Sequence, residues 1–189
     1  IVVLISLVAL AIIAWSFVLR TGEFMMPHVW STADFTAAVS IWAVMMIAMM
    51  LPSAAPMILV FSAVNRKRVT RSVEIVPTWI FTSGYILVWI SFSLLAAGAQ
   101  FILHSFALLS SELSILNPIA SGVVLIAAGI YQFTRVKNVC LENCQSPMDF
   151  LAAHWREGRL GTFIMGIKHG IYCLGCCWFL MALLFVAGI

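Results

Sequence analysis

All five cysteines of the chain lie in its last 50 residues, and their spacing is regular enough to suggest chemistry. They are Cys140, Cys144, Cys173, Cys176 and Cys177. His169 and the last three cysteines occupy positions i, i+4, i+7 and i+8, which share one face of a helix. Thiolate and imidazole bind zinc and copper, and thiolate favours Cu(I). The pattern predicts a soft-metal site of all five cysteines, with His169 as its nitrogen ligand.

A second segment is needed because one straight helix cannot place four ligands around one ion. Gly170 and Gly175 disfavour helix, so we expect a loop or a broken helix at the start of the last apolar segment. Cys140 and Cys144 complete the ligand set if their own loop folds back onto it. The alternative is that these cysteines are small apolar residues that only pack.

A methionine stripe provides further soft ligands. Met45 and Met49 are one helical turn apart, and Met50 follows directly. Thioether sulfur is a neutral ligand that suits Cu(I), so we predict these three residues as weaker, transit ligands. Pro52 and Pro56 are expected to kink or break the helix that carries them. The alternative is again packing, because methionine fills irregular gaps in any helix interface.

The composition indicates a membrane protein, because 63% of the residues are hydrophobic and only 9% are charged. Soluble domains carry about 25% charged residues. Apolar runs long enough to span a bilayer are 2–19, 36–61, 76–103, 119–134 and 171 to the end. We predict an all-α membrane protein, a polytopic bundle with at least five transmembrane helices. Residues 1–189 form a single domain, and we expect both ends to be truncated because the chain starts at Ile1 and stops in an apolar run.

The basic residues predict the orientation. Nine of the ten follow the second and fourth apolar runs, and only Arg20 lies on the opposite side. Under the positive-inside rule, the N-terminus and the long loop 135–170 are cytoplasmic. Thiols there are normally reduced, so a structural disulfide is not expected. Within this loop, residues 147–159 place Phe150, Leu151 and Trp155 on one apolar face, which predicts an interfacial helix on the membrane surface.

Three ordered motifs carry a family resemblance. They read Met45-Met-Ile-Ala-Met49-Met50-Leu-Pro52-Ser-Ala-Ala-Pro56-Met57, Tyr131-Gln-Phe-Thr-x-x-Lys137-x-x-Cys140-Leu-x-x-Cys144-x-Ser-Pro147 and Gly170-x-Tyr172-Cys173-Leu-Gly-Cys176-Cys177-Trp178-x-Leu-Met181. Over about residues 40–189, the chain resembles a bacterial family of predicted metal-binding integral membrane proteins of unknown function. The resemblance implies a multi-pass protein of the bacterial cytoplasmic membrane with a metal site near these cysteines. It implies no particular reaction.

Three functions are compatible with these patterns. The first is binding of copper, or as second choice zinc, for metal handling or for assembly of a membrane metalloenzyme. The second is a non-catalytic subunit of a larger membrane complex, whose seven tryptophans and thirteen phenylalanines contact lipid or partner helices. The third is a membrane thiol–disulfide oxidoreductase, which the cytoplasmic side of the thiols disfavours. A binding role is favoured over catalysis, the bilayer is the expected partner, and nothing points to nucleic acid.

Overall fold

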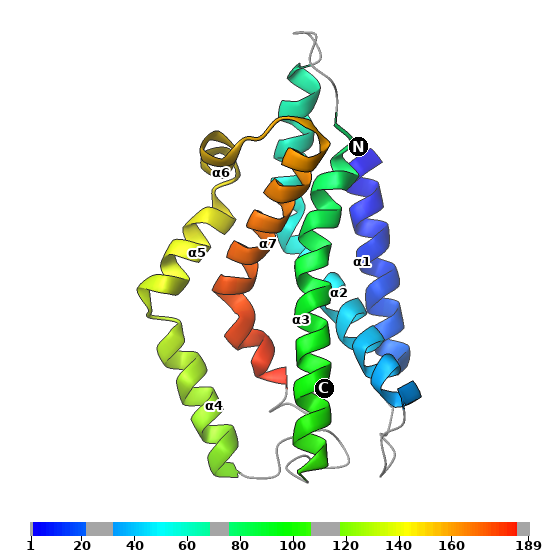
Figure 1. Cartoon of the computed structure of the whole chain (residues 1–189), viewed down its shortest axis with the longest axis vertical. Coiled ribbons are helices and arrows are strands. Elements are labelled where there is room, and N and C mark those ends of the chain that lie inside the picture. Colours follow the sequence, from blue (N-terminus) through cyan, green and yellow to red (C-terminus); the bar gives the residue numbers. More distant parts are fainter. Residues whose placement is uncertain (1, 22–31, 69–75, 107–117, 185–189) are drawn as a thin grey trace.

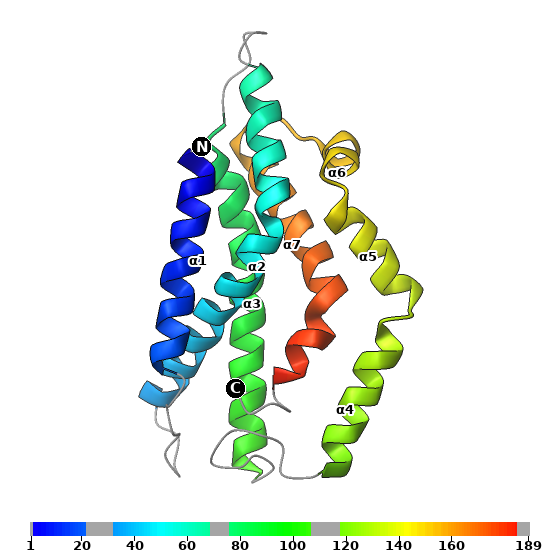
Figure 2. The same ribbon diagram turned by 180° about the vertical axis from the view of Figure 1, so that it is seen from behind.

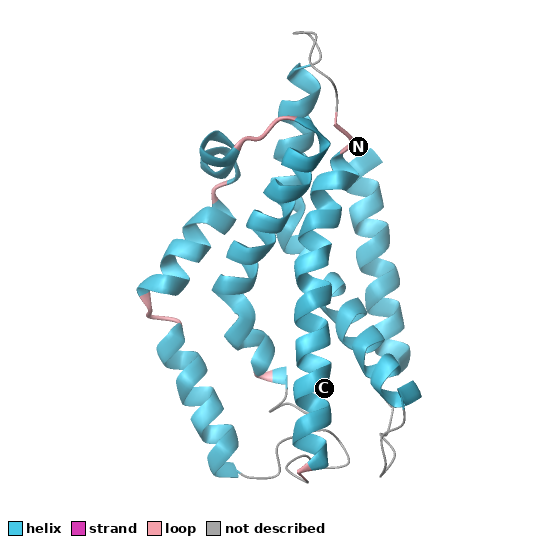
Figure 3. Ribbon diagram, in the orientation of Figure 1, coloured by secondary structure: helices cyan, strands magenta, loops and turns pink. Residues whose placement is uncertain are grey.

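The computed structural model describes residues 2–21, 32–68, 76–106 and 118–184, and these residues form helices joined by short connections. Figure 3 shows no strand in this part of the chain. Its helices are α1 (Val2–Thr21), α2 (Thr32–Arg68), α3 (Thr78–Ser105), α4 (Pro118–Tyr131), α5 (Arg135–Gln145), α6 (Pro147–His154) and α7 (Gly158–Ala182). The all-helical prediction is therefore confirmed. Arg71 of the predicted basic loop and residues 185–189 of the predicted last span lie outside the described residues.

Three of the described helices, α2, α3 and α7, are long and apolar enough to cross a membrane. Helices α4 and α5 meet at an angle of 64° and would provide a fourth crossing if the bent pair counts as one span. The prediction of at least five transmembrane helices is therefore not confirmed. The apolar helices are consistent with association with a membrane.

Helix α7 has neighbours on two sides. It packs extensively against α3 on one side and against α5 on the other, while α4 makes fewer contacts with it. Beyond α3, the bundle continues with α2 and then α1, as the two opposite views show (Figure 1, Figure 2). This order places α7 between the tightly packed helices and the bent α4–α5 pair.

Glycine brings the backbones of α3 and α7 into direct contact. A Cβ atom added to Gly166 would lie 2.0 Å from the carbonyl oxygen of Phe81, and one added to Gly84 would lie 2.3 Å from that of Phe163. Neither position has room for a side chain. This small-residue contact resembles the close helix pairs of membrane proteins. It fixes how α3 faces the cysteine-bearing part of α7.

Helix α2 continues without interruption through Pro52 and Pro56, so the two prolines do not break it. Figure 2 shows that α2 instead changes direction along its length, as expected when proline removes backbone hydrogen bonds. Met45 and Met50 are buried in the main hydrophobic core, and Met49 packs partly buried against it. The methionine stripe therefore faces the interior of the protein.

The segment predicted as the cytoplasmic loop 135–170 is mostly helical, which corrects the sequence-based boundaries. It contains α5, α6 and the first half of α7, so the last long helix begins at Gly158 and not near residue 171. Gly158 has a φ of 74°, a left-handed conformation that glycine adopts easily and that favours a chain reversal before α7. The average hydropathy of residues 158–170 is lowered by Arg159, Lys168 and His169 as well as by the glycines. Here Gly166 serves close packing and does not break the helix.

The predicted interfacial helix is α6, but it ends at His154 and not at residue 159. Its apolar residues Phe150 and Leu151 are buried in the main core of the protein. The apolar face of this helix is therefore turned toward the bundle, which corrects the expectation that it faces lipid.

Candidate metal centre

Three cysteine sulfurs meet between α5 and α7. The Sγ atoms of Cys144, Cys173 and Cys176 all lie within 4.8 Å of one another. Two sulfurs bound to one ion at about 2.3 Å would be at most about 4.6 Å apart. Only a small adjustment would therefore place all three sulfurs around a single ion. All five cysteines are free thiols.

Helix α7 supplies two of these sulfurs from its interior. Cys173 and Cys176 are three residues apart and are 3% and 8% exposed. The helix is continuous through Gly170 and Gly175, so the expected loop or helix break is wrong. Gly170 remains close-packed, since an added Cβ would lie 2.9 Å from a methyl carbon of Val88.

Helix α5 supplies the third sulfur because its approach to α7 is controlled at Gly175. A Cβ atom at Gly175 would lie 2.6 Å from Sγ of Cys140, so only glycine permits this approach without a shift. The hydroxyl of Tyr131, at the end of α4, donates a hydrogen bond to the carbonyl oxygen of Gly175. Thr134 caps α5 by accepting a hydrogen bond from the Lys137 backbone N–H at 3.3 Å. Cys144 thereby lies beside the cysteines of the last span, although the segment that carries it is a helix and not the expected loop.

Cys177 adds a fourth sulfur at the border of the cluster. Its Sγ lies 3.9 Å from Sδ of Met50, which connects α7 to the methionine stripe of α2. The thiols of Cys177 and Cys176 both donate to the carbonyl oxygen of Cys173, at 2.8 and 3.0 Å. Such bonds to the preceding turn are typical of thiol and hydroxyl side chains within helices. A thiolate bound to a metal would give up this donor role.

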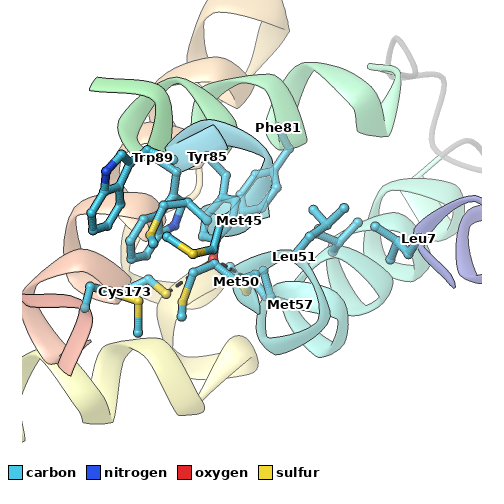
Figure 4. Packing of buried hydrophobic residues seen from close by; sticks show 14 of the residues in the cluster. Leu7, Met45, Met50, Leu51, Met57, Phe81, Tyr85, Trp89 and Cys173 are labelled. Carbon is cyan, nitrogen blue, oxygen red and sulfur yellow. Dashed lines mark hydrogen bonds between the residues drawn. The ribbon is translucent and has the colours of Figure 1, made fainter. Parts of the chain in front are cut away.

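Tyr85 of α3 is a neighbour of the centre that the sequence analysis missed. Its hydroxyl donates to the carbonyl oxygen of Met50 at 2.8 Å and lies 3.3 Å from Sγ of Cys173. Figure 4 shows Met45 and Met50 beside Tyr85 and near Cys173, with Leu7 farther away. A tyrosine within an apolar run was the available signal, because a buried hydroxyl needs a partner.

The other predicted ligands lie around the three sulfurs but not among them. Cys140 packs against Gly175, one turn before Cys144 on α5. His169 lies one turn before Cys173 and is fully buried among aromatic rings. Met45 and Met49 belong to the adjoining core or pack against it. Among the described residues, the cysteine, histidine and acidic side chains close enough to share one metal ion are Cys144, Cys173 and Cys176.

Comparison with protein families gives this cluster a context. A family model described as "PpoB2: Copper chaperone" matches residues 39–189. The chain belongs to this family. The PpoB2 match begins within α2 and includes the cysteines, the methionine stripe, Tyr85 and His169, while α1 lies outside it. It supports the metal-binding part of the family resemblance. Comparisons with the curated proteins and with solved structures gave no match.

Proposed function

We propose that this protein binds one Cu(I) ion as cargo at Cys144, Cys173 and Cys176. The observation that carries the proposal is the mutual approach of these three sulfurs from two helices. It is supported by the copper chaperone description of the family. The thiols would lose their protons on binding, so copper uptake releases protons and weakens as the pH falls.

The surroundings of the three sulfurs favour copper over zinc. Structural zinc sites are closed by four nitrogen or sulfur ligands, whereas soft thiolate and thioether ligands select Cu(I). Cys177 and Met50 place a thiol and a thioether directly beside the cluster. Sulfur ligands at the border allow stepwise ligand exchange, which a chaperone needs in order to pass its ion to a partner. We assign Met45 and Met49 to the same transit role, with weaker binding than the thiolates.

The apolar helices support a membrane setting. We propose a multi-pass protein of the bacterial cytoplasmic membrane, with a cytoplasmic N-terminus and the copper centre within the bundle. Its partners would be the bilayer and subunits of a membrane metalloenzyme that receives the copper. Support comes from three helices that are long and apolar enough to cross a membrane and from the one-sided distribution of basic residues.

Anaerobic Cu(I) titration of the detergent-purified protein against a chromophoric chelator tests the proposal. We expect one tightly bound Cu(I) per chain, and its loss in the Cys173→Ser/Cys176→Ser double variant. Cys140→Ser distinguishes the three-sulfur centre from the five-cysteine site predicted from the sequence, because Cys140 packs outside the cluster. Retention of the tightly bound copper by the double variant would contradict the proposal.

A further inference from the structure

His169 is a buried imidazole without hydrogen-bond partners. Its side chain is 1% exposed, and neither Nδ1 nor Nε2 has a partner in the described structure. A neutral imidazole carries one donor and one acceptor, and leaving both unpaired in the interior costs free energy. Buried polar groups are nearly always paired, so this exception needs an explanation.

The aromatic rings around His169 pack against its imidazole but provide no hydrogen bond to its nitrogens. Its ring centroid lies 5.6 Å from that of Tyr85, 6.1 Å from that of Phe81 and 5.4 Å from that of Phe150. The Tyr85 hydroxyl is already engaged with Met50 and Cys173. The imidazole nitrogens are therefore available to a ligand that enters the bundle.

Helix α7 sets His169 within a row of soft donors. Met165, His169 and Cys173 are spaced by four residues, so they lie on one side of the helix with a rise of about 6 Å between neighbours. All three are buried. The row runs from the α6 end of α7 to the sulfur cluster.

A second histidine, His154 of α6, lies near this part of α7, with its ring centroid 6.0 Å from that of Tyr172. Phe150 of α6 contacts both imidazoles: it stacks on His154 at 4.8 Å and meets His169 edge-on at 5.4 Å. His154 is only half-buried. Phe150 therefore connects the half-buried His154 to the buried His169.

We propose that His169 is a transit ligand, at which Cu(I) is held between the α6 end of the bundle and the three-sulfur centre. This inference rests on the proposed copper function and adds the route by which the cargo arrives. Imidazole nitrogen and the thioether of Met165 are neutral ligands, so they bind Cu(I) more weakly than thiolates do. The ion then moves to Cys173, one turn further along α7. No electron is transferred, and protons leave only at the thiols.

Stopped-flow loading from a Cu(I)–chelator complex tests this role with a pair of variants that match in volume. His169→Leu removes the donor nitrogen, and His169→Met restores a soft donor of similar size to leucine. We expect His169→Leu to slow loading by about tenfold, equivalent to about 1.4 kcal/mol of barrier, with unchanged copper stoichiometry at equilibrium. His169→Met should load close to the wild-type rate, and His104→Leu serves as a control on α3.

Each other result overturns the transit role. Wild-type loading by His169→Leu would make the residue dispensable, and loss of stoichiometric copper would make it a permanent ligand of the centre. Equal slowing or equal unfolding of the leucine and methionine variants would mean that the imidazole shape matters and its donor atom does not. Failure of the proposed function can be distinguished from failure of the transit role, because the wild-type protein itself would then bind no Cu(I) tightly.

Discussion

The two helices on either side of α7 differ sharply in how they are packed. On one side, α3 touches α7 backbone to backbone at Gly84 and Gly166 and buries nine of its residues, Tyr85 among them. On the other side, α5 has no buried residue, yet it carries Cys144. The candidate metal centre thus has two buried sulfurs on α7 and one sulfur on α5, a helix that packs against α7 but has no fully buried residue. Such a division suits a cargo site, because one ligand can withdraw without unfolding the bundle.

The stability of the protein should respond most strongly to mutation at the contact between α3 and α7. Gly166→Ala places a methyl group 2.0 Å from a backbone oxygen of α3, so the helices must separate. We expect a loss of about 4 kcal/mol or more in the free energy of unfolding, since overpacking and lost contacts act together. Thermal unfolding in detergent, with alkylation of the buried Cys173 thiol as a second readout, measures it.

Gly98→Ala is the matched control for this change. Gly98 lies on the same helix α3, but an added Cβ there meets no atom within 4 Å. Alanine favours helix over glycine by about 1 kcal/mol, so this variant should be neutral or slightly more stable. Equal stability of the Gly166→Ala variant and the wild-type protein would refute the close contact.

A substitution on α5 should have a large effect on copper binding and little effect on folding. Cys144→Ser removes one of three sulfur ligands, and we expect Cu(I) affinity to fall by at least about 100-fold, the upper range for losing even an outer partner of a metal ligand. The unfolding free energy should change by no more than about 0.5 kcal/mol, because α5 buries no residue. Chelator competition and thermal unfolding of the same preparation give both numbers.

Tyr85→Phe tests the α3 side of α7 with a smaller change. It removes the hydroxyl that bridges Met50 and Cys173, while the Met50 carbonyl keeps the hydrogen bond from Ser53 at 2.7 Å. We expect a loss of about 1 kcal/mol in stability with one Cu(I) still bound per chain. Denaturant unfolding and copper titration check the two parts. Loss of the bound copper would instead show that the hydroxyl is needed for the centre.

Tyr131→Phe tests the α5 side of α7 and has the smallest expected effect. It removes the hydrogen bond that ties the end of α4 to Gly175 of α7. We expect a stability loss of about 0.5 kcal/mol, the lower end for a hydrogen bond, because this pair is only partly buried. Hydrogen exchange should speed up in α5 and remain unchanged in α3. Tyr172→Phe on α7 is the control. Faster hydrogen exchange in α3 would contradict the difference between the α3 side and the α5 side of α7.

The cysteine pattern was sufficient to predict that two segments meet. Cys144 needed a partner segment to form a metal site, and it lies with Cys173 and Cys176 in the structure. The helical class was also readable, because apolar runs of span length leave few alternatives to helix. The first inference rests on the residue types and their spacing, and the second on the length of the apolar runs, and both can be read from the sequence.

The start of α7, the role of Tyr85 and the orientation of α6 could not be predicted, because they depend on contacts between helices. The start of α7 at Gly158 was missed because Gly170 and Gly175 were interpreted as helix breakers, whereas they are sites of close packing. The role of Tyr85 depends on a pairing between α2, α3 and α7 that spacing along one segment cannot reveal. Likewise, α6 turns Phe150 toward the core and not toward lipid, because the bundle offers a closer apolar surface.

X-ray absorption at the copper edge, on protein loaded with one Cu(I), tests the central claim most directly. The account predicts three sulfur neighbours at about 2.3 Å, the distance typical of metal–thiolate bonds. Cys144→Ser should reduce this number to two, since its sulfur belongs to the cluster. A shell dominated by nitrogen or oxygen, or a sulfur count unaffected by Cys144→Ser, would contradict the three-sulfur centre.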